Sequence, residues 1–298
     1  MGSGNRPFVD TRIRDLAAAG DAAVVAADRW RLAAPEMLRH GMNAIYRSRD
    51  VVLRVSTPSA PARLSLALAE TLRDEGIPVV DAVRDDVVEH GGMSVTAWRH
   101  VEATGGAIDW PAVGAIVRRV HELDPATLPV GLPQPSPVSF PWWRFDDMLE
   151  AVDGHLDRRA LDGLTAAIER HAGWSDFDAT VVCHGDVHPG NVIMSADGVV
   201  LIDWDLLCVA PRGWDHAPLM TWTERWGGAH GVYEEFADGY GWSARGDRDA
   251  EAFAELRLVA ATLMRVRAGL ADPAAMPEAE RRLAHWRGDP GAPIWRAQ

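Results

Sequence analysis

The chain contains 298 residues, of which 47% are hydrophobic and 24% are charged, a composition typical of a globular protein of about two domains. Acidic residues outnumber basic ones by 43 to 30, which gives a formal net charge of −13, and every basic residue is an arginine. The absence of lysine excludes chemistry that needs a lysine amine, such as Schiff-base formation. The scattered arginines offer no basic face to a phosphate backbone, which argues against nucleic acid as a partner.

Cysteine usage and hydropathy predict a cytoplasmic protein. The two cysteines, Cys183 and Cys208, lack the C-x-x-C spacing of zinc and redox sites, and we expect both to be small core residues. No stretch approaches the ~18 consecutive apolar residues of a membrane span, and the first ten residues lack the apolar segment of a secretory leader. We therefore expect no membrane partner, and either a monomer or a homodimer.

Strand signals dominate the first hundred residues. Short β-prone runs alternate there with polar turns, and one Leu- and Ala-rich helix ends at Gly76 and Pro78. In chain order, the expected elements are a hairpin of strands at 43–47 and 51–55, a helix at 60–75, and strands at 79–83, 87–90 and 93–98.

Beyond residue 100 the pattern becomes mostly helical, with a proline-rich loop at 125–141 and a short β island between the later helices. We predict an α+β fold with a small β-rich lobe at residues 1–98 and a larger, mainly helical lobe at residues 99–298. In this second lobe, helices are expected at 110–123, 144–172, 214–240 and 248–269, and strands at 181–184, 191–194 and 199–203.

Two loops of the β island concentrate polar side chains. The first reads HGDVHPGN (184–191), and the second reads LIDWD (201–205). An aspartate followed five residues later by an asparagine, with another aspartate on the next hairpin arm, supplies one base and two oxygen ligands for Mg²⁺. This arrangement suits phosphoryl transfer. We predict that Asp186 accepts the proton of an incoming hydroxyl and that Asn191 and Asp203 hold the metal.

These two motifs resemble the catalytic loop and the metal-binding motif of the aminoglycoside phosphotransferase family, a group of protein-kinase-like small-molecule kinases. GMNAIYR (41–47) with VVLRV (51–55) is similar to the family's nucleotide-covering hairpin, and SVTAWRHVE (94–102) to its hinge. PRGWDHAPL (211–219) resembles the segment whose aspartate, here Asp215, braces the catalytic loop. The resemblance extends over roughly residues 40–270.

The resemblance implies a bilobal kinase-like fold with Mg²⁺ as cofactor and ATP or GTP as co-substrate. It further implies transfer of the terminal phosphate to a hydroxyl of a small molecule, above all an antibiotic of the aminoglycoside type, which would give resistance by modification. We expect supporting roles for His184, Asp205 and Asp215. The implied nucleotide-binding residues are Asn43, Arg54, Ala97, Trp98, Arg99 and His188.

Arg54 stands where the family has a strand lysine that meets the nucleotide phosphates. A guanidinium keeps the positive charge and can bind phosphate through two hydrogen bonds, so we expect Arg54 to take that role. The nearest carboxylate on the helix at 60–75 belongs to Glu70. Whether Glu70 or no acidic residue pairs with Arg54 stays open.

Other functions stay open as well. In a metallohydrolase, His184, Asp186 and His188 would form a transition-metal cluster, although this leaves Asn191 and the second loop unexplained. A nucleotide-binding pseudokinase is suggested by the missing lysine. The acceptor could be another hydroxyl-bearing metabolite or a non-aminoglycoside antibiotic, because function resides in the acceptor site and not in the fold. The choice between ATP and GTP is equally open.

Overall fold

A computed structural model describes residues 6–296. Residues 1–5 and 297–298 lie outside the described residues. The first five belong to the ten-residue stretch in which we expect no secretory leader. The strands are β1 (Glu36–His40), β2 (Ala44–Ser48), β3 (Val51–Ser56), β4 (Val88–His90), β5 (Met93–Arg99), β6 (Val181–Cys183), β7 (Val192–Ser195), β8 (Gly198–Leu201) and β9 (Cys208–Ala210). The α-helices are α1 (Leu16–Arg29), α2 (Arg63–Asp74), α3 (Trp110–His121), α4 (Phe145–Glu150), α5 (Arg158–Arg170), α6 (Gly213–Met220), α7 (Trp222–Trp226), α8 (Val232–Tyr240), α9 (Arg248–Ala271) and α10 (Met276–Trp286).

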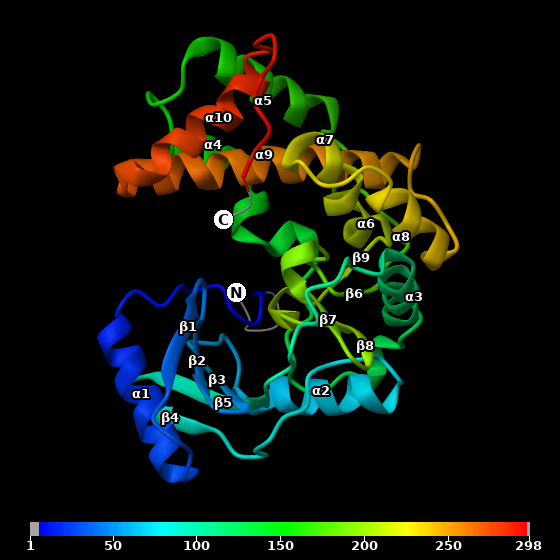
Figure 1. Ribbon diagram of the computed structural model, residues 1–298. Coiled ribbons are helices and arrows are strands. Elements are labelled where there is room, and N and C mark those ends of the chain that lie inside the picture. Colours follow the sequence, from blue (N-terminus) through cyan, green and yellow to red (C-terminus); the bar gives the residue numbers. More distant parts are fainter. Residues whose placement is uncertain (1–5, 297–298) are drawn as a thin grey trace.

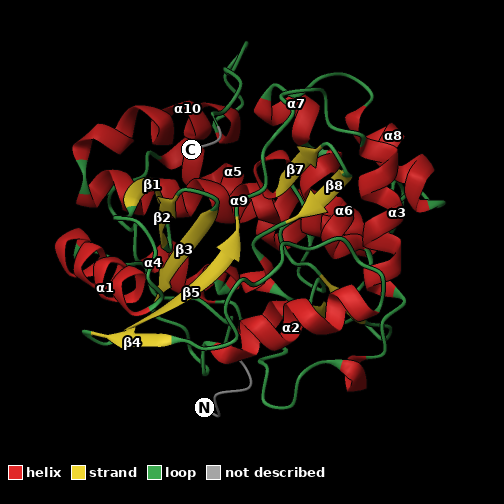
Figure 2. Cartoon of the chain, turned by 60° about the horizontal axis from the view of Figure 1, so that its bottom comes forward, coloured by secondary structure: helices red, strands yellow, loops and turns green. Residues whose placement is uncertain are grey.

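The N-terminal lobe is built on a five-stranded antiparallel sheet with the strand order β1-β2-β3-β5-β4. Because successive side chains of a strand point to opposite faces, Leu53 and Val55 enter the lobe's core while Val52 and Arg54 face the other way. Helix α1 packs against the core side through buried alanines (Figures 1 and 2). This alternation turns Arg54 toward the second lobe.

The C-terminal lobe is mainly helical. Figure 1 shows α9 and α10 at the end of the molecule opposite the five-stranded sheet. Two small antiparallel sheets, β6-β9 and β7-β8, lie within this lobe and carry the two polar loops at their ends. The prediction of an α+β, kinase-like bilobal fold is confirmed. The predicted boundary between residues 98 and 99 falls one residue before the end of β5.

Several predicted elements differ from the structure. The segment 79–83 is not a strand, and a single bridge joins Ala82 to Trp98. The helix expected at 144–172 is divided into α4 and α5, because Gly154 adopts a left-handed φ of 74° and Asp157 caps a new helix. The helix expected at 214–240 is divided into α6, α7 and α8, with left-handed glycines at 227 and 231. Elements α1, β1, β9 and α10 were not predicted.

Cys183 and Cys208 are free and buried, as predicted, and they face each other across β6 and β9. Within residues 6–296, no helix combines the length and the apolar character needed to cross a membrane.

Candidate active site

The loop after β6 brings Asp186 and Asn191 together. The Asn191 side-chain amide donates to the Asp186 carbonyl oxygen at 3.0 Å and lies 3.3 Å from the Asp186 carboxylate. The His188 Nδ1 accepts the Gly190 N–H at 3.0 Å, which leaves the proton on Nε2, 3.4 Å from the Asp186 carboxylate. Burial alone would raise the pKa of Asp186, but the hydrogen bond from His188 and the positive charge of Arg257 lower it to about 2. Asp186 is therefore ionised at neutral pH.

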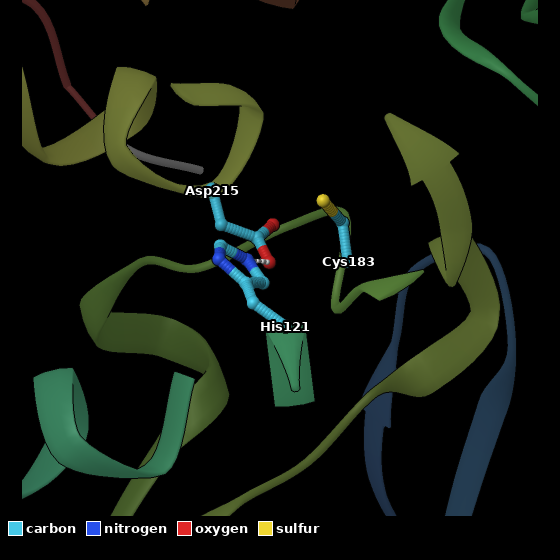
Figure 3. Close-up of side chains that lie close together, drawn as sticks. All are labelled: His121, Cys183 and Asp215. Atoms are coloured by element: carbon cyan, nitrogen blue, oxygen red, sulfur yellow. Dashed lines mark hydrogen bonds and ion pairs between the residues drawn. The ribbon is translucent and has the colours of Figure 1, made fainter. Parts of the chain in front are cut away.

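Asp215 fixes the backbone of this loop through hydrogen bonds. Its carboxylate is fully buried and accepts the N–H groups of His184 and Gly185, each at 2.8 Å. His121 donates to the same carboxylate at 3.1 Å, and its other ring nitrogen accepts from the Tyr240 hydroxyl at 2.9 Å. Figure 3 shows the His121 ring directed at Asp215. These contacts are those of a structural brace.

His121, Cys183 and Asp215 form the one group within residues 6–296 whose ligand atoms have metal-like spacing, within 4.8 Å of one another (Figure 3). Both imidazole nitrogens and both carboxylate oxygens of the group already have hydrogen-bond partners. Burial raises the pKa of the Cys183 thiol well above its usual value, which disfavours the thiolate that binds metals. We therefore interpret this group as a hydrogen-bond network.

The transition-metal cluster of the metallohydrolase hypothesis does not form. His184 faces the Ile202 carbonyl at 3.1 Å through Nε2, and its Nδ1 accepts the Asp186 N–H at 3.3 Å. Both nitrogens are thus committed to backbone groups, and burial lowers the pKa of the ring. His184 ties the catalytic loop to the second polar loop.

The β7-β8 hairpin places Asn191 beside the second loop, because the Ile202 N–H donates to the Asn191 carbonyl at 3.0 Å. Asp203 follows with a left-handed φ of 67°, unusual for a residue with a side chain. Burial and the negative charge of Asp205 raise the pKa of Asp203 to about 6.

A hard divalent cation fits this group of residues. All candidate ligands are oxygens, and Asn191 keeps its side-chain oxygen available because its NH₂ group is used by Asp186. Burial and the nearby negative charge of Asp205 disfavour an ionised Asp203, and a bound cation would offset both effects. Asn191 and Asp203 would hold Mg²⁺, as the sequence predicts.

Arg54 pairs with an acidic residue, and that residue is Asp205 rather than Glu70. Its guanidinium forms a buried ion pair with Asp205, in which 15% of the Arg54 side chain and 8% of the Asp205 side chain are exposed. The Asn43 amide donates to the same carboxylate at 2.9 Å, and the Phe8 N–H donates to the Asp205 carbonyl at 3.1 Å. Glu70 is exposed on α2. Asp205 thus joins the second polar loop to β3, to the β1-β2 turn and to the N-terminal segment.

A cavity of about 360 Å³ lies between the lobes, within the usual size range of small-ligand sites. Four of the residues expected to bind the nucleotide line this cavity: Asn43, Arg54, Trp98 and Arg99. Its other wall residues are Phe8, Leu38, Arg39, Ile45, Val52, Ser65, Leu68, Ala69, Val79, Val80, His100, Val101, Leu132, Pro133, Ile193, Leu201, Ile202, Asp203, Trp204, Asp205 and Leu207.

Two predicted nucleotide residues lie outside this wall. Ala97 is fully buried opposite Leu53 in the core of the N-terminal lobe, so its side chain does not reach the cavity, and any nucleotide contact there would involve its backbone. The alternation of β5 turns it inward, and its carbonyl already accepts the Val83 N–H at 2.9 Å. His188 lies instead beside Asp186.

Three further residues at the site were not identified from the sequence. Arg39 on β1 lines the cavity and approaches the Asp203 carboxylate to 3.9 Å, and β1 itself was not predicted. Phe8 reaches the cavity from the N-terminal segment. Arg257 comes from α9 and approaches Asp186 to 3.8 Å. Only the fold brings these residues to the site.

Curated proteins with similar sequences include phosphotransferases. A curated aminoglycoside 3'-phosphotransferase from Streptomyces ribosidificus is 30% identical over 138 residues, which cover 37% of this chain and 47% of that protein. The matches span about half the length of the curated relatives.

Solved structures share the fold. A GDP complex of aminoglycoside 2'-phosphotransferase-IIIa has a TM-score of 0.68 at 14% identity and covers 93% of this chain and 99% of the other. A choline/ethanolamine kinase family protein from Mesorhizobium loti has a TM-score of 0.63 at 17% identity, with 89% and 94% covered. The sequence profile described as "Phosphotransferase enzyme family" matches residues 38–259, most of the chain. The chain therefore belongs to the phosphotransferase enzyme family.

Proposed function

We propose that this chain transfers the terminal phosphate of ATP or GTP to a hydroxyl group of a small molecule. The observation that carries the proposal is the convergence of Asp186, Asn191 and Asp203 on two adjoining loops, of which the second lines the cavity that also contains Arg54. Phosphoryl transfer needs positioning and charge neutralisation more than covalent chemistry, and this arrangement supplies both.

Asp186 acts as the base. Its carboxylate accepts the proton of the acceptor hydroxyl while the hydroxyl oxygen forms a bond to the γ-phosphorus, and the bond between that phosphorus and the bridging oxygen breaks to release the nucleoside diphosphate. His188 and Asn191 orient the carboxylate through their contacts with it. Asn191 and Asp203 would hold Mg²⁺, which would neutralise negative charge on the phosphate oxygens.

The nucleotide occupies the cavity between the lobes. Its apolar walls suit a purine ring, and the hinge residues Trp98 and Arg99 lie along one side. Arg54 and Asn43 lie near the metal loop, where the phosphates would be. Arg54 exchanges part of its interaction with Asp205 for the phosphates, which a guanidinium with five donors can do.

The acceptor that we propose is a cationic, hydroxyl-bearing antibiotic of the aminoglycoside class. Two observations support it: the names of the curated relatives and the net charge of −13, which attracts a polycation. A second candidate is a hydroxyl-bearing metabolite, because a choline/ethanolamine kinase family protein has a similar fold. The two free, buried cysteines fit a reducing compartment, so we propose a cytoplasmic location.

The test is a panel of acceptors incubated with Mg²⁺ and either ATP or GTP, with phosphorylated products detected by mass spectrometry. We expect at least one acceptor to gain a phosphoryl group, with aminoglycosides preferred over neutral sugars and antibiotics. Asp186→Asn is the control that keeps the size of the side chain and removes the base. Nucleotide-dependent products that the control forms equally fast would contradict the proposal.

A further inference from the structure

Arg257 occupies an unusual position beneath the catalytic loop. It comes from the middle of α9, and its Nη2 donates to the Gly185 carbonyl at 2.8 Å and lies 3.4 Å from the Trp214 carbonyl. Its guanidinium carbon lies 4.2 Å from the centre of the Trp214 ring, and its Nη1 lies 3.8 Å from the Asp186 carboxylate. Only 18% of the side chain is exposed. A charged group is thus held under the peptide that precedes the base.

We propose that Arg257 is a positioning residue for the phosphate transfer described above, acting through the Gly185–Asp186 peptide. The inference rests on the proposed function of Asp186 as the base. At 3.8 Å, the Nη1 is too far from the Asp186 carboxylate for a direct hydrogen bond. Its effect on the carboxylate is therefore conveyed by the backbone and by its positive charge.

Asp215 and Arg257 both hold the backbone of the 184–191 loop through hydrogen bonds. Asp215 accepts the N–H groups of His184 and Gly185, and Arg257 donates to the carbonyl of Gly185. Gly185 itself adopts a left-handed φ of 91°, and a Cβ there would overlap the carbonyl oxygen of Leu206. Holding both the donor and the acceptor side of Gly185 fixes the peptide plane that leads into Asp186. The direction of the Asp186 side chain follows from that plane.

Stability alone does not explain an arginine at this position. Its Nε is buried and finds no hydrogen-bond partner within residues 6–296. A buried unpaired donor destabilises a fold, and a buried charge adds a desolvation penalty. The planar guanidinium, in contrast, suits the task because it stacks on Trp214 and donates to two carbonyls at the same time.

The first test compares Arg257→Met with Arg267→Met. Arg267 is an exposed arginine of the same helix, so the control removes the same charge without touching the loop. Because Arg257 is not among the cavity residues, we expect Arg257→Met to lower kcat about 100-fold, the usual effect of a misplaced reacting group, with the KM for nucleotide unchanged. Arg267→Met should match the wild type in both.

The second test restores the missing group. In Arg257→Ala, millimolar guanidinium ion should recover at least 10-fold of the lost kcat, since the site is partly open to solvent. The same ion should leave Asp186→Asn inactive. Unchanged kcat in Arg257→Met, or a loss of kcat together with an equal rise in KM and no rescue by guanidinium, would overturn the inference.

Hydrogen–deuterium exchange separates this inference from the proposed function. We expect Arg257→Met to speed amide exchange in residues 184–191, while Arg267→Met exchanges like the wild type. If the wild type phosphorylates no acceptor, the proposed function fails, and faster exchange in this loop still supports the positioning contact. Exchange in the loop at the wild-type rate would overturn the positioning role whatever the activity.

Discussion

The ion pair between Arg54 and Asp205 allows a quantitative test, because it joins the two lobes and is almost completely buried. We consider three variants: Arg54→Met, Asp205→Leu and the double substitution. Each single change leaves one buried charge without its partner, which costs about 3–5 kcal/mol of unfolding free energy. Replacing both charges by apolar side chains removes the desolvation penalty as well, so the double variant should lie within about 1–2 kcal/mol of the wild type.

Urea denaturation of the four proteins yields the coupling energy. We expect a favourable coupling of at least about 4 kcal/mol, because the two single changes together cost far more than the double change. The Asn43 hydrogen bond is lost in both variants that lack Asp205, so it cancels in this comparison. Additive destabilisation by the two single changes would refute the ion pair as a structural link between the lobes.

Nucleotide binding by the double variant tests the second role of Arg54. Loss of a hydrogen bond to a charged group costs about 1.5–3 kcal/mol, which corresponds to a roughly 10- to 100-fold higher Kd for ATP or GTP. Isothermal titration calorimetry measures this change in a protein that is still folded. An unchanged Kd would show that Arg54 serves the fold and not the phosphates.

Two further predictions concern the backbone and the pH dependence of stability. Gly185→Ala should cost about 3 kcal/mol of unfolding free energy and abolish turnover, because Gly185 has a left-handed φ and an added Cβ would overlap Leu206. Gly198 also has a left-handed φ but open space around it, so Gly198→Ala should cost only about 1 kcal/mol. Urea titration of the two variants measures both costs. Burial lowers the pKa of His216 from 6.5 to about 3, so the folded protein keeps this ring neutral while the unfolded chain protonates it below pH 6.5. Stability should therefore fall by up to ~1.4 kcal/mol per pH unit between pH 6 and 4, and His216→Gln should reduce that slope; equal slopes in the two proteins would contradict the assignment.

Local patterns predicted much of the site. The strands β2 and β3 were predicted from their β-prone runs, and the two polar loops from the spacing of their aspartates and asparagine. These features depend on residues close together in the chain. Arg54 was selected because it stands where the resembled family has a strand lysine. Helix α1 was not predicted, although its signals are also local: Asp15 caps it, and its buried alanines lie on one face.

The remaining features depend on contacts between distant residues. Asp205 lies 151 positions from Arg54, so no periodicity could identify it as the partner. Arg257 lies 72 positions from Gly185, on a helix whose sequence gives no sign of a catalytic contact. The direction of the Ala97 side chain likewise follows from the pleat of β5, which turns it into the core of the N-terminal lobe. Tertiary packing decides such positions.

The central claim is that Asp186 acts as the base in phosphate transfer. The most direct test is a single-turnover measurement with saturating nucleotide and the acceptor found in the panel, in which ³¹P NMR monitors the phosphorus species. The wild type should produce a phosphate monoester on one hydroxyl of the acceptor in step with release of the nucleoside diphosphate. Asp186→Asn should bind the nucleotide with unchanged Kd and transfer phosphate at least ~10³-fold more slowly, since the base is lost. Transfer by this variant at the wild-type rate would contradict the account.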